Sequence, residues 1–194
     1  MKHLFLLFLI ALLPMVASAE AVEINGIYYN LVAKVKQAEV TNKPSGYYTG
    51  SVTIPESVTY GGIEYSVTAI GEKAFFYCKS LTSVTIPNSV TKIGSAAFQS
   101  CILLTSITIP NNVISIGHHA FDTCTSLTSV IIPNGVTSIE FYTFYGCTSL
   151  TSLVIPNSVT SIGQSAFYHC SGLTSITFPN VLNTLGRSSF EGCI

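Results

Sequence analysis

The sequence predicts a mainly β solenoid, in which coils of equal length stack along one axis. Three observations support this fold class. Each period contains a short stretch of alternating apolar and polar residues, which is typical of a β-strand. Apolar residues recur at fixed points of the period, as expected for a protein whose repeats contact only their neighbours. The clearest marker is a set of six cysteines at equal intervals along the chain: Cys78, Cys101, Cys124, Cys147, Cys170 and Cys193.

Residues 1–19 have the features of an export signal. Lys2 gives a positive start, an apolar run follows from Leu4 to Val16, and residues 17–19 form a small-x-small cleavage site. The apolar run is too short to span a bilayer comfortably. We therefore expect cleavage after Ala19 and a protein that is secreted or displayed on the cell surface.

The composition argues against several partners. Only 9% of the residues are charged and the net charge is −1, whereas roughly 25% charged residues is usual in soluble domains. Neither nucleic acid nor an anionic membrane is indicated as a partner. No later stretch is long and apolar enough to span a membrane, and we expect no cofactor.

Residues 78–100 illustrate one coil. Val84 and Ile86 are predicted to point inward, and the residues between them outward. Pro87 ends this strand because it cannot donate a ladder hydrogen bond. A second extended piece follows, and then Gly94, where we expect a left-handed or tight backbone. Residues 95–100 are expected to form a short helical turn that places Phe98 in the core.

Stacked coils superimpose equal positions at a spacing of roughly 4.8 Å. The inward side chains, each worth roughly 1.5–3 kcal/mol when buried, then form ladders. Thr143 and Ser189 replace a recurrent alanine, and Glu140 replaces the recurrent glycine, so we expect a backbone shift near Glu140. Besides the cysteines, the predicted structural ladder consists of Phe75, Phe98, Phe121, Phe144, Phe167 and Phe190.

The predicted domain order is a signal peptide at 1–19, an N-terminal β-hairpin cap at 20–50 and the solenoid at 51–194. Asn25-Gly26 indicates a hairpin in the cap. The solenoid starts with a degenerate repeat that contains a second hairpin signal at Gly61-Gly62. Five 23-residue repeats follow and are cut off at the sixth cysteine. We expect that the C-terminal edge is tolerated, is covered by a partner, or marks a fragment.

The string from Ser80 to Gly94, followed by Ala97-Phe98 and Cys101, resembles the BspA-like, or Treponema-type, leucine-rich repeat. The resemblance extends over residues 50–194. It implies a leucine-rich-repeat solenoid on an exported protein, with a role in adhesion or protein binding at the surface of a host-associated microbe.

The even number of cysteines in an exported chain suggests disulfides, but the period argues against them. Equal positions in adjacent coils keep their Cβ atoms near the stacking distance, which is longer than the roughly 3.8 Å of a disulfide. We therefore expect buried free thiols, with Cys193 the most exposed. A zinc site is not expected, since a linear ladder cannot surround an ion tetrahedrally.

One cluster, formed by His118, His119, Asp122 and His169, resembles a catalytic or metal site. His119 and Asp122 could share one face of a helical turn, but His169 is two coils away, about 10 Å by strand spacing. We interpret these residues as solvated, variable positions, and predict neither a metal site nor catalytic residues. Serine is too abundant here for a Ser-His-Asp triad to be indicated.

Variable positions cluster after the recurrent glycine and between phenylalanine and cysteine, where Phe76 and Tyr77 also lie. Exposed aromatic residues on a rigid frame often form contacts, although here they could also pack along the solenoid. A second candidate surface is the serine row from Ser83 to Ser175 beside Thr85 and Thr108. The predicted ligand-contact residues are Phe141, Tyr142, Tyr145, Tyr168, His118, His119 and His169.

These observations favour a non-catalytic, exported binding or adhesion module that recognises extracellular or surface proteins of a host or neighbouring cell. The alternative is a structural spacer or surface protein that self-associates through its C-terminal edge. Ice binding is less favoured, because the Ser/Thr register is not a strict threonine array. A hydrolase is least favoured, because no acid–base pair recurs at a defined cleft.

Overall fold

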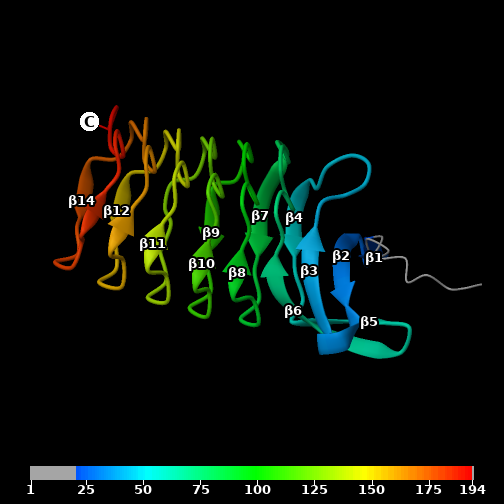
Figure 1. The fold of residues 1–194 in the computed structure, drawn as a ribbon. Helices are drawn as coiled ribbons and strands as arrows, with labels where there is room; N and C mark the ends of the chain where they lie inside the picture. The colour runs from blue at the N-terminus through cyan, green and yellow to red at the C-terminus, as the bar shows by residue number, and fades with distance from the viewer. Residues whose placement is uncertain (1–20, 194) are drawn as a thin grey trace, which may run out of the picture.

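The computed structural model describes residues 21–193, so the expected signal peptide lies outside the described residues. The chain winds into coils that stack side by side from the cap to the C-terminal coil (Figure 1). The coils contribute short strands to two parallel rows, except that the coil of residues 124–146 has only an isolated bridge, at Ser129, in the first row. The first row contains β4 (Gly50–Thr53), β7 (Leu81–Thr85), β9 (Ser106–Thr108), β12 (Ser152–Val154) and β14 (Ser175–Thr177). The second contains β8 (Lys92–Ile93), β10 (Ser115–Ile116), β11 (Ser138–Ile139), β13 (Ser161–Ile162) and β15 (Thr184–Leu185).

The N-terminal cap continues the second row. β1 (Val22–Ile24) and β2 (Ile27–Val32) form the predicted hairpin at Asn25-Gly26. A short 3-10 helix (Ala33–Val35) leads to β3 (Gln37–Thr41), which is antiparallel to β2 and parallel to β6 (Ile63–Ile70). β5 (Ser57–Tyr60) and β6 form the second predicted hairpin, at Gly61-Gly62. β6 then pairs with β8, so the cap and the first coils share one sheet.

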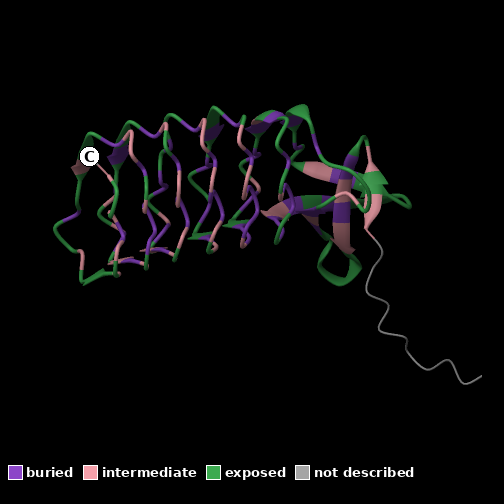
Figure 2. Ribbon diagram, turned by 90° about the horizontal axis from the view of Figure 1, so that it is seen from above, coloured by how far each residue is buried: buried purple, intermediate pink, exposed green. Residues whose placement is uncertain are grey.

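The core is a set of ladders along the solenoid axis. The six phenylalanine rings from Phe75 to Phe190 stack with centroids 5.0–5.3 Å apart and nearly parallel planes. Tyr48, at the cap end, covers the first ring at 4.8 Å. Figure 2 shows that the buried segments run along the whole length of the stack. A residue in the core therefore depends on the coils on both sides for its burial.

The cysteines are free, and all but Cys193 are buried. From Cys101 onward, each thiol donates a hydrogen bond of 3.1–3.2 Å to the carbonyl of the phenylalanine 26 residues earlier, as in Cys101 to Phe75. Burial raises the pKa of these thiols, to about 12 at Cys170. They therefore pack as small apolar groups with a weak donor.

The segment predicted to be a short helical turn forms consecutive reverse turns instead. The amides of Ala97 and Gln99 bond within their own coil, whereas those of Ala96, Phe98 and Ser100 donate to carbonyls of the next coil at 2.8–2.9 Å. A helix would keep all these bonds local and leave the stacking direction unsatisfied. Ala96 and Ser100 have positive φ, and Gly94 does not. A Cβ at Gly94 would lie 2.6 Å from the nearest backbone atom, so of the two alternatives for Gly94, the tight backbone is correct.

The predicted backbone shift at Glu140 appears as a seam between the coils of residues 101–123 and 124–146. The recurrent glycines donate to the isoleucine carbonyl of the preceding coil at 2.7–2.9 Å, but within residues 21–193 the equivalent bond from Glu140 to Ile116 is absent. β10 and β11 accordingly belong to different sheets. In the other strand row, pairing at this junction is reduced to one bridge, Ser106–Ser129. A side chain where the coils need glycine thus separates β10 from β11 in the second row. In the described part of the chain, the first row has no strand pairing at the following junction either, between residue 129 and β12.

Candidate aromatic binding surface

The turn segments place the variable residues side by side along one edge of the solenoid. Three adjacent coils contribute rings to this surface, which we name the aromatic edge. The turns expose these positions because their alternate residues, such as Phe121 and Phe144, point into the core. The aromatic edge consists of His118, His119, Phe141, Tyr142, Tyr145, Tyr168 and His169.

Stacking between coils orders the aromatic edge. His118 stacks on Phe141 with ring centroids 4.6 Å apart, and His119 stacks on Tyr142 at 4.8 Å. Tyr145 stacks in the same way on the tyrosine of the next coil at 5.1 Å. Offset aromatic pairs contribute about 0.5–1.5 kcal/mol beyond burial. The rings therefore pack on one another, and Phe141, His118 and His169 also remain exposed to solvent.

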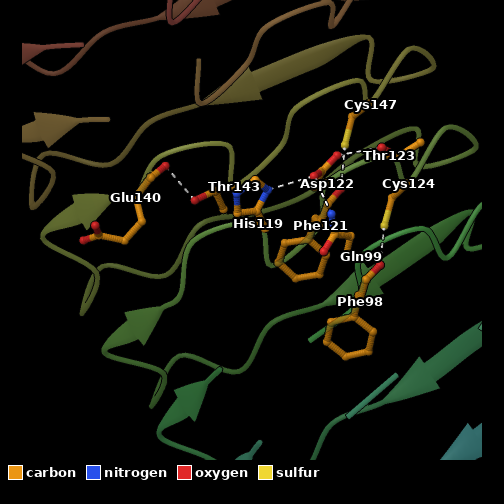
Figure 3. Close-up of polar contacts among 10 residues, drawn as sticks. All are labelled: Phe98, Gln99, His119, Phe121, Asp122, Thr123, Cys124, Glu140, Thr143 and Cys147. Atoms are coloured by element: carbon orange, nitrogen blue, oxygen red, sulfur yellow. Dashed lines mark hydrogen bonds and ion pairs between the residues drawn. The ribbon is translucent and has the colours of Figure 1, made fainter. Parts of the chain in front are cut away.

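Asp122 is not solvated, in contrast to the prediction from the sequence. Only 7% of the residue is exposed. His119 Nδ1 lies 2.8 Å from one carboxylate oxygen, which also accepts a 2.8 Å hydrogen bond from Gln99, and Thr123 donates to the other at 2.6 Å (Figure 3). Partners on the preceding coil and on its own turn thus satisfy the buried carboxylate. Asp122 thus orients the ring of His119, which stacks on Tyr142.

The histidines do not assemble a triad. Ser95 Oγ lies 3.1 Å from His118 Nδ1, while Asp122 contacts His119. A nucleophile–base–orienter relay needs one histidine between the two partners, and here each histidine has only one of them. Among residues 21–193, no group of three His, Cys, Asp or Glu side chains is arranged to hold a metal ion.

The sequence model of the BspA type leucine rich repeat region matches residues 68–194, with six copies. This chain belongs to the BspA-type leucine-rich repeat family. No curated protein sequence matches it significantly. Within the part that the structure describes, no helix has the length and apolar character needed to cross a membrane.

Solved structures of bacterial leucine-rich repeat proteins share the fold of this BspA-type chain. A leucine rich cell surface protein of Faecalibacterium prausnitzii is 35% identical, with a TM-score of 0.67; the match covers 90% of this chain but only 52% of that one. The leucine rich repeat protein of T. pallidum is 30% identical, with a TM-score of 0.71 and coverage of 86% and 82%. A leucine-rich repeat protein from Eubacterium ventriosum is 26% identical, with a TM-score of 0.69 and coverage of 90% and 50%.

The BspA-type coils also carry an exposed feature that the sequence reasoning missed. Ile131 and Val154 occupy the outward strand position that Thr85 and Thr108 hold in the first two coils. They are 79% and 67% exposed and lie on adjacent coils, beside the serine row. The broken alternation in Val130-Ile131-Ile132 was the available signal, because an apolar residue there must face outward.

Proposed function

We propose that this chain is a non-catalytic protein-binding module of a bacterial cell surface, and that it binds extracellular or surface proteins through the aromatic edge. The single observation that carries the proposal is the row of stacked rings on three adjacent coils. The leucine-rich cell surface protein of F. prausnitzii, with its similar fold, supports the location.

Physical chemistry favours contact rather than catalysis at this edge. The backbone beneath the rings is held by hydrogen bonds in two directions, so little conformational entropy is lost when a partner docks. Tyrosine offers a large apolar area with one polar group, and it is enriched among residues that dominate binding energy. Tyr142 and Tyr145 lie 5.6 Å apart at the centre of the row.

The test is binding to a panel of immobilised extracellular-matrix and mucosal proteins, measured by surface plasmon resonance. Replacing Tyr142 and Tyr145 by serine should weaken binding about 30-fold or more, if together they contribute at least about 2 kcal/mol. The control is Tyr60→Ser in the β5–β6 hairpin, because Tyr60 is 50% exposed and lies outside the aromatic edge. Unchanged affinity in the double variant, with a normal thermal melt, would place the binding surface elsewhere.

A second candidate function is a self-assembling spacer. The outward face of the last described coil forms an apolar depression of about 260 Å³, with Phe178 and Phe190 among its lining residues. Phe178 is exposed there and packs edge-on against Phe190 at 5.3 Å. Light scattering at increasing concentration tests this candidate; a constant monomer mass would count against it, and Phe178→Ser should abolish any association that occurs.

A further inference from the structure

Two adjacent cavities lie where the cap meets the first, degenerate repeat, away from the aromatic edge. The first, of about 180 Å³, lies between the loop after β3 and the turn segment of residues 73–78. The second, of about 230 Å³, lies beside it, and Tyr47 lines both. Tyr47 and Tyr77 are exposed here, whereas Tyr48 is buried at the base of the first cavity. The coil of residues 78–100 lies between these cavities and the aromatic edge, and it has the small side chains of Ser95 and Ser100 in its turn segment.

Basic side chains surround these cavities. Lys43 and Lys73 line the first cavity, and Lys79 lines the second. They are three of the eight basic residues in the chain, which has nine acidic ones. We name the surface formed by these lysines with Tyr47, Phe76 and Tyr77 the basic patch.

The lysines and rings of the basic patch are arranged together. The ammonium of Lys43 lies 5.1 Å from the ring centroid of Tyr48, and that of Lys79 lies 5.3 Å from that of Tyr77. Lys73 pairs with Glu72 at 3.4 Å, but both side chains are more than half exposed. An exposed pair of this kind is screened and weak, so the patch keeps a net positive charge.

We infer that the basic patch binds an acidic peptide segment of a partner protein, with one aromatic or aliphatic side chain in the first cavity and carboxylates against the lysines. The apolar walls of the first cavity favour a peptide over other anionic ligands. Its walls include Tyr48, Ala74 and Phe76, and a sulfated sugar or free phosphate would use the lysines but leave these apolar walls uncovered. Charge complementarity and a side-chain-sized apolar recess together fit a peptide. This site goes beyond the proposed function, because it does not involve the aromatic edge.

The test is fluorescence anisotropy with a labelled heptapeptide of six glutamates and one central phenylalanine, compared with two matched peptides. One has glutamine for each glutamate, and the other has alanine for phenylalanine. The parent peptide should bind at least about fivefold more tightly than either, and its binding should weaken as salt rises. Equal binding of the glutamine peptide would overturn the inference.

Matched variants locate the site. Lys43→Gln with Lys73→Gln should weaken binding of the parent peptide at least about fivefold. Lys34→Gln with Lys36→Gln makes the same charge change on exposed lysines outside the patch and should leave binding unchanged. Equal losses in the two double variants would mean only non-specific attraction. Lysine-dependent heparin binding, with no advantage of phenylalanine over alanine in the peptide, would assign the patch to polyanions and refute the peptide proposal.

Discussion

Glu140 provides a sharp test of how the coils are held together. At the other coils the recurrent glycine brings two backbones into contact; a Cβ at Gly163 would lie 2.5 Å from the amide nitrogen of Phe141. At Glu140 the Cβ is present, and two intercoil bonds are missing within the described chain, from Glu140 to Ile116 and from Thr137 to Ile114. The Cβ, rather than the carboxylate, is therefore predicted to keep the coils apart.

Comparison of Glu140→Gly with Glu140→Ala isolates this effect, because both remove the carboxylate and its 2.6 Å hydrogen bond from Ser138. Glycine normally destabilises a protein by about 0.5–1 kcal/mol relative to alanine. Two regained hydrogen bonds contribute about 1 kcal/mol each. The glycine variant should therefore be more stable than the alanine variant by about 1 kcal/mol, opposite to the usual order.

Urea unfolding followed by far-UV circular dichroism measures the difference, and hydrogen exchange should show a newly protected amide at residue 140. Gly163→Ala is the reciprocal control. It should break the bonds from Gly163 to Ile139 and from Thr160 to Thr137, now 2.7 and 2.9 Å, and cost about 1–2 kcal/mol after the entropy gained by replacing glycine. If Glu140→Gly were instead the less stable of its pair, with no new protection, the seam would have another cause.

Three further outcomes are expected. Phe121→Ala, in the middle of the ring ladder, should lower the free energy of unfolding by about 3–5 kcal/mol, whereas Phe190→Ala, stacked on one side and only partly buried, should cost clearly less; equal urea midpoints would contradict the ladder. In the native protein at pH 8, iodoacetamide should label Cys193 first, and Cys124 and Cys147 last, as mass spectrometry of timed samples would show. The reason is that burial raises the pKa of Cys124 and Cys147 well above the ordinary value, whereas Cys193 is only partly buried. Because the pKa of Cys170 is raised from 9.0 to about 12 in the folded state, its contribution to stability should be complete below pH 9 and lost as pH rises toward 12; unfolding midpoints that do not fall across that window would contradict this assignment.

The sequence predicted the features that depend on local chemistry or on the period. The hairpins at Asn25-Gly26 and Gly61-Gly62 follow from turn residues, and the family follows from a period that holds through five coils. The turns after Gly94 differ from the predicted helical turn because their hydrogen-bond partners lie on the next coil, as in the bond from Ala96 to His118. Spacing alone could not predict the burial of Asp122 either, since it depends on Gln99 one coil earlier.

The seam at Glu140 has a mechanical consequence. Across it, backbone bonds persist along the turn edge, as from Phe121 to Thr143 at 2.8 Å, while strand pairing is interrupted on one face and reduced to a bridge on the other. When the solenoid is stretched or bent, it should yield here first, with the turn edge acting as the hinge. The rings of His119 and Tyr142 lie along this turn edge, so bending the solenoid would also change the spacing of its aromatic residues.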